Sequence, residues 1–287
     1  MRLTVHGHEV YCYTGAKTFD PALPVIMLLH GAQNDHSVWA LQSRALAHRG
    51  YAVLAPDLPG HGRSGGPPLA TVEAMAAWAL AVLGAAGAQR ALLAGHSMGS
   101  LIALEAAHAA PQCVSGVALL GTTYPMKVAD ALLETARSAP QIAIDMVVGW
   151  SHSSWLPGPS TAGPGTSVSN TARRLMQRMA ARGEAGLFHT DFAACNAYAS
   201  GEAAAASIAC PVLCILGRKD MMTPPRSATP LIAALAHGKV VNVDAGHAMM
   251  AEAPDAVLDA LLGFADVVKT AAPAPTLERS TPPTPDL

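Results

Sequence analysis

The sequence has few charged residues, few aromatic residues and no long apolar run. Charged residues make up 13% of the chain and aromatic residues 5%, while hydrophobic residues reach 51%, largely as alanine. No run approaches the roughly 18 consecutive apolar residues that a membrane helix needs. The segment 1–8 lacks the apolar stretch of a secretory signal, so we expect a cytoplasmic protein. The net charge of −2 predicts neither a nucleic-acid partner nor a membrane partner.

Disulfide and metal-ligand patterns are also missing. The twelve histidines form no H-E-x-x-H motif, and the chain has no pair of C-x-x-C motifs. We therefore expect no metal and no other cofactor. The five cysteines are odd in number and widely spaced, which favours reduced thiols. They are Cys12, Cys113, Cys195, Cys210 and Cys214.

One motif carries most of the chemical information. Gly95-His96-Ser97-Met98-Gly99 is a G-x-S-x-G pentapeptide between an apolar run, 91–94, and a segment of helical composition, 98–109. A serine on a sharp strand-to-helix turn projects its hydroxyl away from the sheet, and the flanking glycines avoid collisions with neighbouring backbone. Ser97 is therefore the predicted nucleophile. The N–H of Met98, at the start of the helix, is a predicted oxyanion donor.

A serine nucleophile needs a base and a group that orients the base. Asp220 follows an apolar strand at 212–216, and His247 turns off a strand at 240–243. The order Ser97, Asp220, His247 is the one that this strand–turn–helix context requires. Asp244 is a rival acid, but it lies on the same turn as His247 and is badly placed to reach the far nitrogen of the ring.

Two further loops are predicted to complete the site. The strand at 25–29 runs into His30-Gly31-Ala32-Gln33, and the N–H of Ala32 is the predicted second oxyanion donor. The strand at 52–55 runs into a turn punctuated by glycines that contains His61. We expect His30 and His61 to shape the substrate pocket, and His96 to pack without taking part in the chemistry.

These segments resemble the α/β-hydrolase superfamily from about Val25 to Val268. The resemblance implies the cofactor-free bacterial branch of small esterases, enol-lactonases, carbon–carbon bond hydrolases and non-haem haloperoxidases or perhydrolases. Members with an aspartate nucleophile are disfavoured by Ser97. The loop Gly31-Ala32-Gln33-Asn34 lacks the glycine run of lipase-type loops, which argues against bulky tertiary-alcohol esters. The matching segments are L-L-H-G-A with Trp39 downstream, A-P-D-L-P-G-H-G-R-S, G-H-S-M-G-S, L-G-R-K-D-x-M-T-P and A-G-H-A-M-M-A-E-A-P.

The alternation of strands and helices predicts an α/β fold with a mostly parallel, doubly wound sheet. About ninety residues separate the strands that end at Leu120 and begin at Val212, far more than an ordinary crossover. We expect a helical cap inserted at 125–206, a core made of 1–124 and 207–269, and a flexible tail at 270–287. The expected strands are two near 3–13, then 25–29, 52–55, 91–94, 117–120, 212–216 and 240–243, and the expected helices lie near 37–48, 71–83, 98–109, 226–236 and 254–268.

The inserted cap is expected to supply the roof of the pocket. The candidates, each of which could simply join the cap to the core, are Met126, Met146, Val147, Trp150, Trp155 and Leu156. Arg174, Arg178 and Arg182 recur every four residues and could receive a carboxylate or phosphate. A solvated helix face is the favoured interpretation of this stripe.

The predicted function is hydrolysis of a small to medium, largely apolar carboxylic ester, lactone or thioester through an acyl-enzyme. Three alternatives stay open: hydrolysis of a carbon–carbon bond in a vinylogous diketone, a cofactor-free perhydrolase or haloperoxidase reaction, and a ligand receptor with slow turnover. The expected partner is a small-molecule substrate, and the chain is a monomer or a homodimer.

Overall fold

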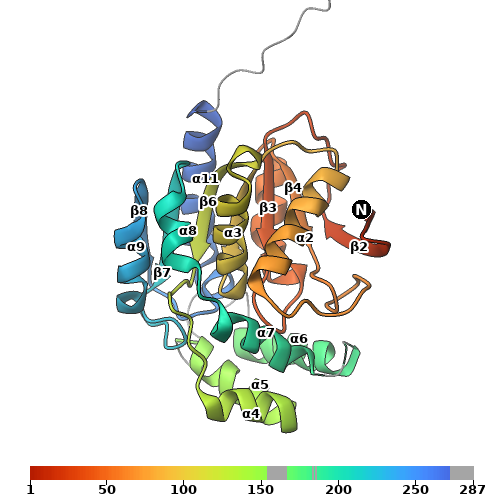
Figure 1. Cartoon of the computed structure of the whole chain (residues 1–287), viewed down its shortest axis with the longest axis vertical. Coiled ribbons are helices and arrows are strands. Elements are labelled where there is room, and N and C mark those ends of the chain that lie inside the picture. Colours follow the sequence, from red (N-terminus) through yellow and green to blue (C-terminus); the bar gives the residue numbers. More distant parts are fainter. Residues whose placement is uncertain (154–166, 183, 185, 272–287) are drawn as a thin grey trace, which may run out of the picture.

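A twisted sheet forms the centre of the protein (Figure 1). The computed structural model describes residues 1–153, 167–182, 184 and 186–271, and this part of the chain forms eight strands in the order β1-β2-β4-β3-β5-β6-β7-β8. The hairpin β1–β2 is antiparallel and β2 pairs antiparallel with β4, whereas all further pairings are parallel. The strands are β1 (Arg2–Val5), β2 (His8–Tyr13), β3 (Val25–Leu29), β4 (Ala52–Pro56), β5 (Ala91–His96), β6 (Val114–Leu120), β7 (Val212–Gly217) and β8 (Gly238–Val243).

Helices cover both faces of the sheet. The inner strands are short apolar runs, and every residue of β3, β4, β5 and β7 is buried, as expected for parallel strands packed on two sides. One face carries α2 (Val72–Ala85), α3 (Met98–Ala109), α8 (Gly201–Ser207) and α9 (Thr229–Ala234). The other face carries α1 (Ala40–His48) and α11 (Pro254–Ala271). Short helices lie at η1 (His36–Trp39), η2 (Pro111–Cys113), η3 (Pro225–Ala228) and α10 (Met249–Glu252).

The sequence-based prediction of the fold is confirmed strand by strand. Each expected strand is present, including the antiparallel hairpin turning at Gly7, and each expected helix has a counterpart within a few residues. The side chain of Thr71 caps α2 by accepting a hydrogen bond from the N–H of Ala74 at 3.1 Å. These elements are predictable because their apolar periodicity and capping residues are local properties of the sequence.

A separate group of helices lies below the sheet in Figure 1 and comes from the long insertion between β6 and β7. It consists of α4 (Asp130–Ser138), α5 (Pro140–Ser151), α6 (Val168–Arg182) and α7 (Leu187–Ala197). These helices bury their own apolar cluster, which includes Ile144, Val148, Met176 and Phe192. The helix α8 also falls within the insertion, but it packs against α3 and α9 on the sheet.

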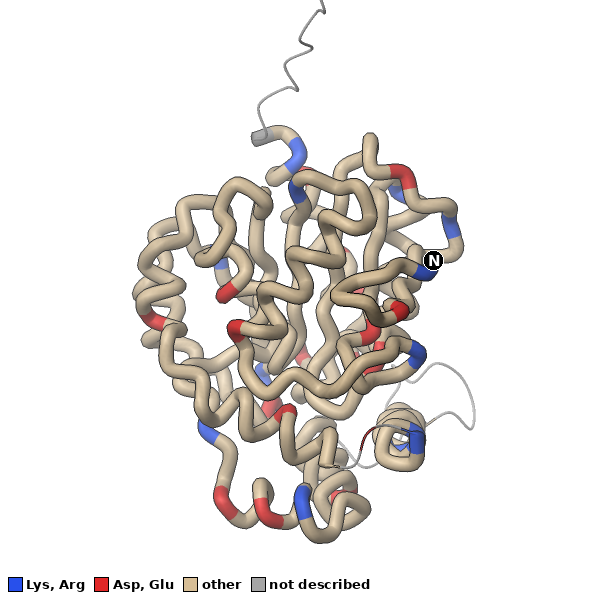
Figure 2. The backbone as a smooth tube through the Cα atoms, turned by 45° about the vertical axis from the view of Figure 1, so that its right-hand side comes forward, with Lys and Arg blue, Asp and Glu red and all other residues tan. Residues whose placement is uncertain are grey.

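No helix among the described residues is long and apolar enough to cross a membrane. Charged residues of both signs are scattered along the backbone of the sheet domain and of the insertion (Figure 2). All five cysteines are free thiols, and Cys12, Cys195 and Cys214 are buried. The expected tail after residue 271 lies outside the described residues.

Candidate active site

The turn between β5 and α3 holds Ser97 in a strained conformation. Ser97 has φ +54° and ψ −120°, a region that side-chain-bearing residues rarely adopt and that marks functional sites. A Cβ at Gly95 would overlap the carbonyl of Gly99, and a Cβ at Gly99 would overlap the carbonyl of Leu29. Both glycines are therefore required for the turn to pass this close to its neighbours. The strained turn and its backbone contacts have the geometry of a nucleophile elbow.

Asp220 and His247 meet at the carboxyl ends of β7 and β8. Nδ1 of His247 lies 2.7 Å from Oδ2 of Asp220, and both side chains are buried. The carboxylate also accepts from the N–H groups of Met222 and Thr223, each at 2.8 Å, and from Oγ1 of Thr223 at 2.7 Å. Burial alone would raise the pKa of Asp220, but the His247 charge and these hydrogen bonds outweigh it and lower the pKa. Asp220 is therefore ionised at neutral pH and holds the ring with Nδ1 protonated.

Thr223 is a site residue that the sequence analysis missed. Its hydroxyl lies 2.7 Å from Oδ2 of Asp220 and 3.1 Å from Nδ1 of His247, so it contacts both partners of the pair. The signal available in the sequence was the pair Thr223-Pro224, which begins three residues after Asp220. The rival acid Asp244 lies elsewhere, since its exposed carboxylate pairs with Nζ of Lys219 at 2.9 Å on the surface.

His96 packs directly on His247. The two rings have centroids 4.6 Å apart, and Nε2 of His96 lies 2.9 Å from the carbonyl oxygen of His247. Burial, with the neighbouring His247 charge as a smaller cause, lowers the pKa of His96 to about 3, so its ring is neutral and donates from Nε2. His96 therefore has the predicted packing role, and the group it packs against is the loop that carries His247.

His30, the first residue after β3, has a fully buried side chain. It does not line the cavity described below, contrary to the sequence-based expectation. Its Nε2 accepts from the N–H of Leu58 at 3.1 Å, so the proton is on Nδ1, which donates to the carbonyl of Gly31 at 2.9 Å. Burial lowers the pKa of His30 to about 4, in keeping with a neutral ring. Since a trans peptide directs its C=O and N–H to opposite sides, this bond turns the N–H of Ala32 away from His30.

The predicted oxyanion donors are both available. Within the described residues, neither the N–H of Ala32 nor that of Met98 donates a hydrogen bond. The carbonyl of Ala32 accepts from the side chain of Asn34 at 2.9 Å, so the peptides on both sides of Ala32 are held. Ala32 and Ser97 line one cavity, and Met98 opens α3 beside them. This arrangement could stabilise negative charge on a carbonyl oxygen attacked by Ser97.

The inserted helices hold the same loop through Asp191. This fully buried residue of α7 accepts from the N–H of Gln33 at 2.8 Å and pairs with Nε2 of His61 at 2.9 Å. Gln33, at φ +55°, also donates from its side chain to the carbonyl of Met176 on α6 at 3.1 Å. His61 is therefore a buried link between loop and cap. It does not line the cavity, contrary to the expectation that it shapes the pocket.

We expect Asp191→Asn to lower the free energy of unfolding by about 1–3 kcal/mol near neutral pH, because a buried charged hydrogen-bond partner is lost. Burial would lower the pKa of His61, but the Asp191 charge and hydrogen bond outweigh it and raise the pKa above its ordinary value of 6.5. A raised pKa stabilises the fold fully below pH 6.5, and this contribution disappears as pH rises through the raised value.

Melting temperatures of wild type and Asp191→Asn across the pH range check this expectation. The gap between the two proteins should be widest in mild acid and should narrow in mild alkali. His30, whose ring centroid lies 4.9 Å from that of His61, stays neutral over this range. A gap that widens with rising pH would contradict the assignment of a protonated His61.

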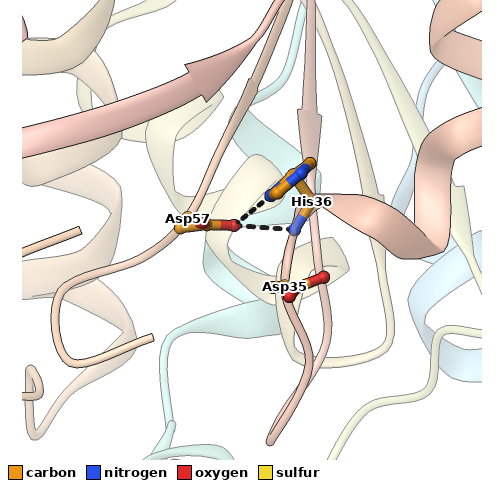
Figure 3. A group of neighbouring side chains, drawn as sticks. All are labelled: Asp35, His36 and Asp57. Carbon is orange, nitrogen blue, oxygen red and sulfur yellow. Dashed lines mark hydrogen bonds and ion pairs between the residues drawn. The ribbon is translucent and has the colours of Figure 1, made fainter. Parts of the chain in front are cut away.

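Asp35, His36 and Asp57 form a cluster on the loops after β3 and β4 (Figure 3). Their ligand atoms lie within 4.8 Å of one another, a spacing that a metal ion could use. The oxygens of the fully buried Asp57, however, already accept from the N–H and Nδ1 of His36 at 2.8 and 2.7 Å and from the N–H of Arg63 at 2.9 Å. The pKa of Asp57, which burial would raise, is lowered by His36. These bonds give the cluster a structural role, that of joining two loops.

Ser97 and His247 open into a cavity of about 480 Å³ between the sheet and the inserted helices. Such a volume suits a small ligand. The roof is apolar, and its members occupy the inner faces of three helices. They include Val147 and Val148 of α5, Leu175 and Met176 of α6, and Phe192 of α7.

Of the side chains expected to form this roof, Val147 lines the cavity, and the others that the structure describes lie elsewhere. Met126 is buried in the core of the sheet, Met146 packs among the inserted helices, and Trp150 is 37% exposed. None of these three is among the described residues that line the cavity, and Trp155 and Leu156 lie outside the described part of the chain. Met146 precedes Val147 by one residue, a step of about 100° around a helix, so the insertion presents the neighbouring face.

A model of the alpha/beta hydrolase family matches residues 26–260. The chain belongs to this family. An uncharacterized protein of Mycobacterium tuberculosis is 34% identical over 118 residues, which make up 41% of this chain and 33% of that relative. The match thus spans only about a third of the relative's length.

Two solved structures, an esterase and an enol-lactonase, share most of this architecture. A thermophilic esterase from Thermogutta terrifontis has a TM-score of 0.76 at 20% identity, covering 93% of this chain and 98% of the esterase. The enol-lactonase from Burkholderia xenovorans has a TM-score of 0.77 at 23% identity, covering 92% and 99% of the two chains. At these identities the likeness establishes the fold, and the reaction must be argued from the site.

Proposed function

We propose that this alpha/beta hydrolase cleaves small to medium carboxylic esters, including lactones or thioesters, through an acyl-enzyme. The observation that carries the proposal is the joint opening of Ser97, on its strained turn, and the Asp220–His247 pair into one largely apolar cavity. Ester hydrolysis needs a nucleophile, a base and oxyanion donors, and the lining residues Ser97, His247 and Ala32 are the candidates that support the proposal.

In the proposed reaction, His247 accepts the proton of the Ser97 hydroxyl as the oxygen attacks the substrate carbonyl. The N–H groups of Ala32 and Met98 stabilise the oxyanion. The leaving alcohol departs with the proton from His247, and the acyl group stays on Ser97. Water then attacks this ester while His247 accepts one of its protons; His247 passes that proton to Oγ of Ser97 as the acyl–oxygen bond breaks, which releases the acid and the free serine. Asp220 stabilises the imidazolium that forms in each step.

A panel of p-nitrophenyl esters of increasing acyl length, run beside dienol-ketone substrates, tests the proposal. The cavity volume predicts the highest kcat/KM for short and medium acyl chains. Turnover of the dienol ketones with negligible ester hydrolysis would favour the carbon–carbon bond hydrolase instead. Peroxide-dependent turnover would favour the perhydrolase, and binding without turnover would favour a receptor.

A further inference from the structure

Two arginines of α6 face the same cavity as the proposed nucleophile. Arg174 and Arg178 both line it, whereas Arg182, the third member of the stripe, does not. No aspartate or glutamate is among the described lining residues. Of the three lining histidines, His96 and His152 have pKa values lowered by burial, so they are neutral at pH 7, and the third, His247, is the proposed base. Arg174 and Arg178 are thus the permanently charged groups of the described cavity wall.

Neither arginine has a counter-ion in the described part of the chain. Arg173, their neighbour on α6, differs in this respect, since its Nε lies 2.7 Å from a carboxylate oxygen of Asp145. The helix Val168–Arg182 itself contains no acidic residue. Two like charges four residues apart on a helix lie about 5–6 Å apart at Cβ and destabilise it slightly. An anion bound between them would remove this repulsion.

Position and chemistry together indicate what the pair could bind. Most of the remaining wall contributed by the inserted helices is apolar, with Val147, Leu175 and Phe192, and its polar members Ser151 and Thr171 carry no charge, so an anion there meets no competing carboxylate. Guanidinium groups bind carboxylates through paired, charge-assisted hydrogen bonds. Because both arginines are exposed, solvent and salt screen this attraction in part.

We propose that Arg174 and Arg178 form an anion subsite, and that the preferred substrates are esters or lactones that carry a carboxylate away from the scissile bond. This inference rests on the proposed ester hydrolysis and makes it specific. The apolar stretch between the two groups of the substrate would lie along the roof. The two arginines would hold the carboxylate at the cavity margin, where both side chains are also exposed to solvent.

Paired substrates test the subsite directly. Methyl esters of linear dicarboxylic acids of increasing length are compared with esters of the same length that end in a neutral carboxamide. The wild type should prefer the acid over the amide, most strongly at the length that spans from Ser97 to the arginines. Added salt should lower kcat/KM for the acid-ended esters and leave the amide-ended esters nearly unaffected.

The double variant Arg174→Gln/Arg178→Gln should reduce the acid-over-amide preference about tenfold or more. The matched control is Arg182→Gln, which removes one charge from the same helix away from the cavity and should leave the preference unchanged. An equal rate on acid and amide in the wild type, or an unchanged preference in the double variant, would overturn the subsite and leave ester hydrolysis standing. Absence of turnover on every ester would instead overturn the proposed function.

Discussion

Ser97→Ala is expected to lower kcat on any ester substrate by at least about a thousandfold, because it removes the proposed nucleophile. The fold should persist. Alanine keeps the Cβ of serine, so the positive φ of +54° costs about as much in the variant as in the wild type. The melting temperature should therefore change little, which separates loss of chemistry from loss of structure.

Covalent labelling provides a second measurement for the same variant. A fluorophosphonate probe should attach to Ser97 in the wild type and should fail to label Ser97→Ala. Ser100, three residues along, hydrogen-bonds the hydroxyl of Thr122 at 2.8 Å and should stay unlabelled in both proteins. Undiminished kcat in Ser97→Ala would remove the serine mechanism from consideration.

Asp220→Asn is expected to lower kcat by roughly a thousandfold or more at neutral pH. An amide cannot stabilise the imidazolium of His247, and its NH₂ group would face the donors that now surround the carboxylate. The matched control is Asp244→Asn. This change removes an exposed charge directly after the neighbouring strand β8 and breaks only the ion pair with Lys219. A surface ion pair of this kind contributes about 0–1 kcal/mol, so Asp244→Asn should behave like the wild type.

The stability of Asp220→Asn must be measured together with its kcat, because Asp220 also stabilises the fold. Its pKa is lowered from the ordinary 3.8, so the carboxylate stabilises the native state above pH 3.8 and loses this effect as pH falls through the lowered value. Asp220→Asn should therefore melt at a lower temperature than the wild type at neutral pH, with the difference shrinking in strong acid. A larger loss of kcat in Asp244→Asn than in Asp220→Asn, with both folded, would reverse the assignment of the acid.

The sheet and the positions of Ser97, Asp220 and His247 were predictable because they depend on local sequence. Each follows a short apolar strand and sits in a turn marked by glycine or proline, and parallel strands bring such turns to one edge of a sheet. Asp220 lies within hydrogen-bond distance of His247, as its position in the sequence suggested. The order and direction of the strands therefore predict which residues meet at this edge of the sheet.

The cavity roof was less predictable because it depends on how the inserted helices pack. Met146 and Val147 are equally apolar neighbours, and only the rotation of α5 decides that Val147 faces the cavity. In the sequence, Asp191 resembles an ordinary helical acid. In the structure it is fully buried against Gln33 and His61, which precede it by 158 and 130 positions. Such long-range partners leave no periodic signal in a single sequence.

The three proposed catalytic residues are far apart along the chain, so during synthesis Ser97 emerges well before Asp220 and His247. A chain that has left the ribosome only as far as α8 contains Ser97 and the whole insertion, but neither Asp220 nor His247. Its strand β6 would also have an unpaired edge where β7 later docks. The nascent chain therefore carries an unactivated serine, and so would a product truncated at that point. Only after β7 and β8 join the sheet can Ser97 gain His247, its proposed base.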